Sequence, residues 1–69
     1  MPLTLAPAGI EQVIKKVGGS EGLKSHLQDI GFVVGARVTV VSTLGGNLIV
    51  NIKNSRVAIS REMAGKILV

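Results

Sequence analysis

The sequence contains no cysteine, no tryptophan and no tyrosine, and Phe32 is its one aromatic residue. Without cysteine the chain forms neither a disulfide framework nor a thiolate metal site. Without several aromatic side chains it offers no stacking platform for nucleic-acid bases and no aromatic groove for proline-rich peptides. No apolar run reaches the roughly 18 residues of a membrane-spanning helix, so we expect none. The core should therefore be almost purely aliphatic.

What the chain does have is enough apolar material for one small core. It is 69 residues long, 46% of them hydrophobic, and we expect one domain over residues 1–69. A domain this short buries a modest share of its surface, so its stability margin should be thin. Residues 1–8 carry no Lys or Arg and no long apolar run, which argues against a secretory signal. We therefore predict a cytoplasmic protein.

The charge balance is basic but dispersed. Eight Lys and Arg face four Asp and Glu, which gives a net charge of +4. Only Lys15 and Lys16 are adjacent, and the other basic residues are spread along the chain. A basic balance is typical of nucleic-acid binders, but a scattered charge of this size is also ordinary for a soluble domain. A small basic nucleic-acid-binding domain is therefore an alternative function, and not the favoured one.

Residues that could carry chemistry are scarce. His26 is the only histidine, and the carboxylates available to work with it are separated along the chain. Nucleophilic catalysis and metal binding both need several convergent groups, so we predict no catalytic residue, no metal ligand and no cofactor. The segment Gly18–Lys24 is glycine-rich and leads into a helix, but it lacks the spacing of a phosphate-binding loop. We interpret it as a turn between a strand and a helix.

The clearest secondary-structure signal lies in Ser20–Ile30. Ser20 can cap the N-terminus of a helix, and Leu27 belongs to an apolar stripe on one face. Gly31 stands where a left-handed residue ends a helix, and Phe32 would then pack back on Leu27. The capping residue, the apolar face and the terminating glycine all agree, so we predict a helix here. Its structural residues are Leu27, Gly31 and Phe32.

Short alternating apolar runs predict strands in the rest of the chain. We expect them at Ile10–Val17, Ala36–Ser42, Leu48–Lys53, around Val57 and Ile59, and at Lys66–Val69. Turns should lie at Leu44–Asn47 and Asn54–Ser55, Leu3 and Leu5 should tuck onto the core, and Ser60 should cap a short helical turn. The predicted fold is mainly β: a five-stranded antiparallel barrel, with one helix after the first strand and a helical turn before the last.

The whole pattern resembles the ferrous iron transport protein A (FeoA) family. The matching motifs are Leu5–Gly9, Leu27–Phe32, Gly35 with Val38, and Val57–Val69. The resemblance implies an SH3-like barrel in which Gly35 is a further structural residue. The chain departs from the family at Gly45–Leu48, because family members often have proline near this hairpin.

The resemblance also implies a function without catalysis. It indicates a cytosolic accessory protein of ferrous iron uptake that binds the cytosolic GTPase domain of a FeoB-type transporter. The same fold forms the C-terminal domain of some metal-dependent repressors, so a metal-responsive regulatory domain is a further alternative.

Strand alternation places several apolar side chains on the outer face of the expected sheet. Val41, Ile49 and Ala58 would lie there, and Leu44 would sit at a hairpin tip. Such a patch can dock a partner or a second copy in a weak homo-oligomer. Our candidate partner-binding residues are Arg37, Leu44, Asn47, Ile49 and Arg56.

Overall fold

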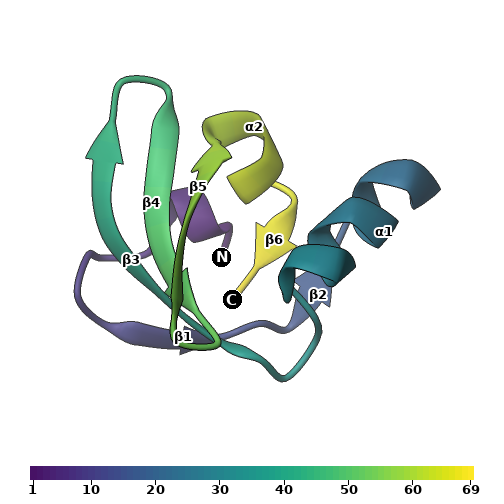
Figure 1. The fold of residues 1–69 in the computed structure, drawn as a ribbon, viewed down its shortest axis with the longest axis horizontal. Coiled ribbons are helices and arrows are strands. Elements are labelled where there is room, and N and C mark those ends of the chain that lie inside the picture. The colour runs from purple at the N-terminus through teal and green to yellow at the C-terminus, as the bar shows by residue number, and fades with distance from the viewer.

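The computed structural model describes residues 1–69 and contains six strands and three helical segments (Figure 1). In chain order they are η1 (Leu3–Leu5), β1 (Glu11–Val13), β2 (Lys16–Val17), α1 (Glu21–Ile30), β3 (Arg37–Leu44), β4 (Asn47–Ile52), β5 (Ser55–Ser60), α2 (Arg61–Ala64) and β6 (Ile67–Leu68). Four strands form one antiparallel sheet in the order β1-β3-β4-β5, and β2 pairs with β6 in a second. The mainly β, antiparallel prediction is confirmed.

The segment predicted as one strand, Ile10–Val17, is two strands in different sheets. β1 pairs with β3, whereas β2 pairs with β6. The backbone changes partner in the middle: the Ile14 N–H donates to the Ala36 carbonyl, and the Lys15 N–H donates to the Leu68 carbonyl. The Ile14 side chain is fully buried at this point. The chain therefore has six strands where five were expected, and the last strand joins the small sheet.

Helix α1 begins and ends as its sequence predicts. The Ser20 side chain accepts a hydrogen bond from the Leu23 N–H at 3.3 Å, which satisfies one of the free donors of the first turn. At the other end, the Phe32 N–H donates to the Leu27 carbonyl and the Gly31 N–H donates to the Gln28 carbonyl. These two bonds define a Schellman ending, which directs Phe32 back into the core.

Gly31→Ala should destabilise the protein, whereas Gly22→Ala, in the same helix, should not. Gly31 has φ +123, which side chains rarely adopt, and a Cβ there would lie 3.3 Å from Cδ of Lys53. We expect a loss of about 1–3 kcal/mol. Gly22 has open space at its Cβ position, and alanine is the better helix former by up to about 1 kcal/mol. Urea unfolding of both variants measures the difference; equal effects would contradict the described helix end.

The two hairpins of the main sheet have two-residue turns. Gly45 and Gly46 connect β3 to β4, and Gly45 has φ +61. The second turn is Lys53–Asn54, one residue earlier than the predicted Asn54–Ser55, because Ile52 pairs directly with Ser55. Lys53 and Asn54 both have positive φ, as a type I′ hairpin turn requires.

Strand β3 also carries a β-bulge that the sequence does not reveal. Its register against β4 shifts between Val40 and Ser42, which leaves Val41 as the extra residue. Beyond the bulge, residues 42–47 are all exposed, so this end of the β3–β4 hairpin projects from the body of the molecule (Figure 1). A bulge bends its strand and increases the local twist, which redirects the tip.

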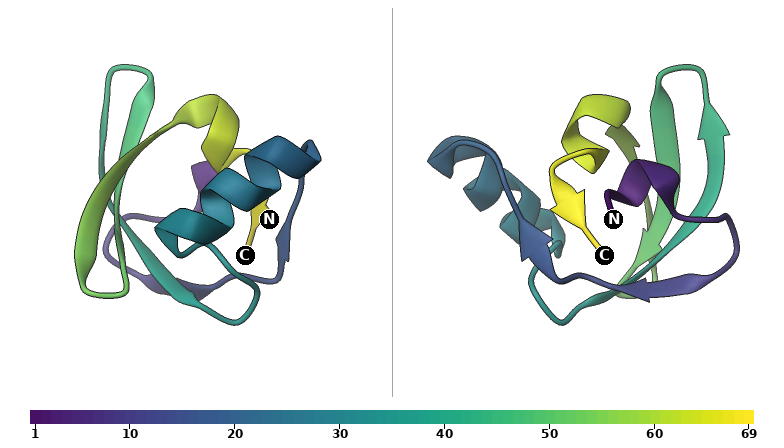
Figure 2. Two further views of the ribbon diagram at one scale, coloured as in Figure 1. Left: turned by 45° about the vertical axis from the view of Figure 1, so that its right-hand side comes forward. Right: turned by 180° about the vertical axis from the view of Figure 1, so that it is seen from behind.

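The two ends of the chain meet next to β6. Met1 and Val69 exchange backbone hydrogen bonds of 2.8 Å, and the termini lie side by side in both views of Figure 2. Before β6, the Ser60 side chain caps α2 by accepting from the Met63 N–H at 3.2 Å, as predicted. Leu3 is buried, but Leu5 is exposed, so the prediction that both leucines tuck onto the core is wrong for Leu5.

One apolar core, aliphatic except for Phe32, joins most of these elements, and β1 contributes no buried side chain to it. Its thirteen members are Leu3, Ile14, Leu27, Phe32, Val38, Val40, Leu48, Val50, Ile52, Ile59, Ala64, Ile67 and Val69. No polar or charged side chain is buried with them. The inward side chains of β4 alternate, as strand geometry requires, and so leave its remaining positions on the outer face of the sheet. That outer face carries both apolar and polar side chains, among them Ile49 and Asn51 of β4.

Candidate docking surface

The described residues offer no arrangement suited to metal binding. No group of three or more His, Cys, Asp and Glu side chains lies close enough together to hold an ion. His26 is exposed on α1, with Ser25 and Asp29 exposed near it on the same helix.

The glycine-rich segment before α1 serves as a turn. Gly19 has φ +99, and a Cβ at this position would come within 2.8 Å of Cδ2 of Leu23. The side chain of Ser20 is engaged in capping the helix. The segment therefore positions the first turn of α1 and packs Leu23 against it.

The outer face of the four-stranded sheet is organised in rows across the strands. In one row, Ile49 of β4 lies between Ser42 of β3 and Ala58 of β5. Ile49 is half-buried and its two neighbours are exposed. Of the predicted outward patch, Ile49 and Ala58 lie on this face, and Ala58 is exposed. Val41 is the half-buried bulge residue and has no partner in this row.

The β3–β4 hairpin continues this face into solvent. Leu44 and Asn47 are directly opposite each other on either side of the Gly45–Gly46 turn. Leu44 is 72% exposed, the highest value among the large exposed apolar residues. An exposed leucine on a projecting hairpin can insert into a partner without any rearrangement of the core.

The five predicted partner-binding residues fall into two groups. Leu44, Asn47 and Ile49 share the projecting hairpin, whereas Arg37 begins β3 at its opposite end. Arg37 and Leu44 are the first and last residues of β3, seven residue steps apart, which is roughly 23 Å in an extended strand. Arg56 lies nearer to Arg37's end, on β5, directly opposite Asn51. One flat contact centred on the hairpin tip would not include both arginines.

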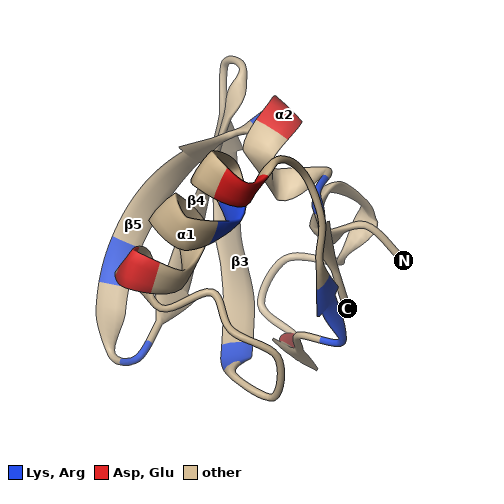
Figure 3. Ribbon diagram, turned by 90° about the vertical axis from the view of Figure 1, so that its right-hand side faces the viewer, with Lys and Arg blue, Asp and Glu red and all other residues tan.

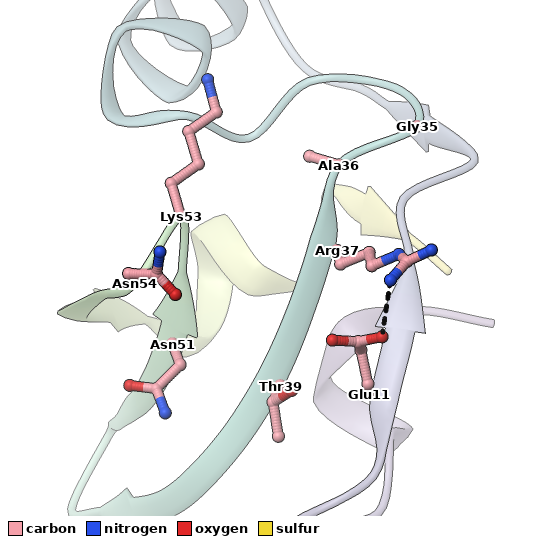
Figure 4. Close-up of a pocket in the computed structure, with 8 residues that line it drawn as sticks. All are labelled: Glu11, Gly35, Ala36, Arg37, Thr39, Asn51, Lys53 and Asn54. Atoms are coloured by element: carbon pink, nitrogen blue, oxygen red, sulfur yellow. Dashed lines mark ion pairs between the residues drawn. The ribbon is translucent and has the colours of Figure 1, made fainter.

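A hollow of about 780 Å³ lies on the outer face at the Arg37 end of the sheet (Figure 4). Its lining consists of Glu11, Gly35, Ala36, Arg37, Thr39, Asn51, Lys53 and Asn54. We call this feature the sheet-face groove. The bottom of the groove is a row of residues paired across neighbouring strands: Glu11 of β1, Thr39 of β3 and Asn51 of β4.

Sequence reasoning identified Arg37 of this groove, and Gly35 as a structural residue, but missed the rest. Asn51 occupies an outward position of β4, so strand alternation offered a signal for it. Lys53 was predicted as the last residue of that strand, but it lies in the turn that follows. Glu11 and Thr39 join them only through the pairing of β1 with β3, which no local pattern specifies. The groove is a product of strand order.

Charges around the groove are unequal. The structure has two ion pairs, Arg37–Glu11 at 3.7 Å and Lys24–Glu21 at 4.0 Å, and both are exposed. Glu11 is the one acidic residue of the groove, and it is already paired with Arg37. Lys53 and Arg56 have no ion-pair partner. Figure 3 shows acidic positions on both helices, away from the outer face of the sheet.

Lys53 also has a structural role. A Cβ on Gly31 would lie 3.3 Å from its Cδ, so its aliphatic stem runs past the end of α1. Figure 4 shows the side chain extending toward that helix. Helix α1 has no basic residue in its last turn. A positive charge near a helix C-terminus is favourable. Lys53, in the turn after β4, therefore supplies the positive charge that the last turn of α1 lacks.

Neither helix is long and apolar enough to cross a membrane.

Comparison with known proteins gives this surface its context. The sequence profile of the FeoA domain matches residues 1–69. A relative from Methanocaldococcus jannaschii, named as an Fe(2+) transport protein A, is 34% identical over 68 residues, which are 99% of this chain and 83% of that protein.

Solved structures agree with the profile. The solution structure of iron(II) transport protein A from Clostridium thermocellum superposes with a TM-score of 0.92 at 26% identity, covering 99% of this chain and 43% of that one. The crystal structure of Stenotrophomonas maltophilia FeoA complexed with zinc, described as a prokaryotic SH3 domain protein, gives 0.86 at 25% identity, covering 100% and 88%. The chain therefore belongs to the FeoA family, which acts in ferrous iron transport, and it has the SH3-like fold of that family.

Proposed function

We propose that this protein is a non-enzymatic accessory of ferrous iron uptake, located in the cytoplasm, that binds the cytosolic GTPase domain of a FeoB-type transporter. Membership of a ferrous iron transport family supports the process. The exposed Leu44 on the projecting β3–β4 hairpin supports the mode of action.

Leu44 is the proposed anchor of the contact. A few side chains that are buried in pockets near the centre of an interface carry most of its binding free energy. Leu44 is ready for that role, because the hairpin holds it away from the core and no other side chain must move. Asn47 lies directly opposite it and can supply hydrogen bonds at the rim, while Ile49 extends the apolar surface along β4.

Co-purification from membranes tests the proposal. The tagged protein should retain a FeoB-type transporter from solubilised membranes of cells that express both proteins, and Leu44→Asp should abolish the retention. Leu5→Asp is the matched control, because Leu5 is 69% exposed but lies on η1, away from the hairpin. If the wild-type protein retains no transporter, or if both variants behave alike, the proposal is wrong.

A further inference from the structure

The sheet-face groove has a chemistry of its own, separate from the hairpin tip. Seven of its eight lining residues are not hydrophobic, with Ala36 as the exception. Thr39, Asn51 and Asn54 make no side-chain hydrogen bond in the structure, since the side-chain bonds present belong to Ser20 and Ser60. Three polar side chains in one hollow therefore have unused hydrogen-bonding capacity, on a face where two arginines and a lysine gather.

The size and polarity of the groove exclude several kinds of ligand. A volume of about 780 Å³ far exceeds what one ion needs, because a water molecule takes up about 30 Å³ in the liquid. Sites for small organic molecules and cofactors are predominantly apolar, which this groove is not. Nucleic-acid bases would need aromatic surfaces to stack on, and no aromatic residue lines it. Once single ions, small organic molecules and nucleic-acid bases are set aside, a polar polypeptide segment remains as the ligand of the groove.

The basic side chains without an ion-pair partner indicate that this segment is negatively charged. Lys53 starts at the rim of the groove and extends toward the end of α1 without an acidic partner, and Arg56 adjoins the groove through its cross-strand neighbour Asn51. Glu11 neutralises only Arg37, and it does so through one exposed contact of 3.7 Å that a competing carboxylate can replace. A segment rich in Asp and Glu would find cations along one side of the groove and amide donors beside them.

The width of the groove indicates that the segment is extended. Its lining crosses β1, β3 and β4, which is about 10 Å at the usual spacing between strands. An extended chain advances about 3.3 Å per residue, so roughly three residues would cross it. In such a segment every second side chain would point toward the protein, so the first and third residues would each contact one edge of the groove.

We propose that the sheet-face groove binds an extended acidic segment of the partner protein. The groove would thereby orient the protein on that partner, while the hairpin tip supplies apolar contact. That the segment belongs to the transporter's cytosolic domain rests on the function proposed above. The ligand chemistry of the groove rests on its own residues and can be tested without the transporter.

The first test uses a synthetic peptide of alternating Glu and Ser, with a Lys–Ser peptide of the same length as the control ligand. Titration into isotope-labelled protein at low salt, followed by NMR, should shift the side-chain amide signals of Asn51 and Asn54 saturably. The Lys–Ser peptide should not shift them. The response should fade as salt is added, because exposed charge contacts are screened.

Paired variants separate a built site from general attraction between opposite charges. The double substitution Arg37→Gln and Lys53→Gln removes two cations from the groove. Its control, Lys16→Gln with Lys66→Gln, removes two exposed cations from the second sheet and the turn before it, so the net charge is identical. We expect the groove variant to bind the acidic peptide about fivefold more weakly, the effect of two exposed ion pairs, and the control to bind as the wild type does.

The outcomes distinguish the two proposals. Equal weakening by both double variants, or peptide-induced shifts spread over all the basic residues, would overturn the groove as a site. Groove-specific binding of the peptide without any binding of the transporter's GTPase domain would contradict the proposed function and this choice of partner, while the ligand chemistry of the groove would stand. Circular dichroism of each variant checks that it is folded, since Lys53 also borders the end of α1.

Discussion

Phe32→Ala is expected to lower the free energy of unfolding by about 3–5 kcal/mol. Phe32 is the only aromatic residue, it is 0% exposed, and its removal leaves a cavity that the surrounding aliphatic side chains cannot fill without moving. At about 0.05–0.15 kcal/mol per residue, a chain of this length has only about 3–10 kcal/mol in total. The variant should therefore lose between about a third and all of its stability, and thermal melts by circular dichroism should show a much lower melting temperature.

Val34→Ala is the matched control for this substitution. Val34 follows Phe32 by two residues but is 68% exposed, so its truncation should change stability by less than about 0.5 kcal/mol. Leu27→Ala, in the same core, should cost about 2–5 kcal/mol. If Phe32→Ala melts like Val34→Ala, the end of α1 does not deliver Phe32 to the core as described.

Leu44→Asp is expected to weaken binding to the transporter's GTPase domain by about 30-fold or more, without destabilising the fold. A truncated anchor residue typically costs 2 kcal/mol or more of binding free energy, and each 1.4 kcal/mol is about tenfold. Because Leu44 is 72% exposed, aspartate there should leave the melting temperature nearly unchanged. Fluorescence anisotropy with a labelled GTPase domain measures the affinity, and Leu5→Asp again serves as the control.

Ile49→Asp tests the adjoining surface and should also weaken the contact. Ile49 is half-buried between Ser42 and Ala58, so this variant should lose some stability yet remain folded. If Leu44→Asp and Ile49→Asp both unfold the protein, the assignment of inner and outer faces is wrong. If both bind normally, the hairpin is not the docking element.

The helix could be predicted from sequence because its signals are local. Ser20 caps it, Leu27 and its neighbours form the apolar stripe, and Gly31 ends it, all within a dozen residues. The family resemblance was equally readable, since its motifs depend on order and spacing along the chain. Both were confirmed.

The turn between β4 and β5 could not be located from the same kind of signal. Turns at Lys53–Asn54 and at Asn54–Ser55 give registers that differ by two residues. A shift of two keeps every side chain on the same face of the sheet, so both registers bury Ile52 and Val57 equally well by pattern alone. Packing of Lys53 along the end of α1, a contact between distant segments, accompanies the observed turn.

The split of the first strand is likewise a tertiary effect. Nothing in Ile10–Val17 marks the point where the backbone leaves β3 and turns to β6. Ile14 is apolar in either arrangement, and only the presence of β6 beside Lys15 explains the change of partner. The sheet-face groove escaped prediction for the same reason, because three strands and two connecting segments contribute to it.

Calorimetric titration of the purified cytosolic GTPase domain of the transporter with the wild-type protein tests the central claim most directly. The account predicts saturable binding in a one-to-one complex, which Leu44→Asp weakens and Leu5→Asp does not. The absence of any binding at protein concentrations approaching about 1 mM, which corresponds to less than about 4 kcal/mol of binding free energy, would contradict it.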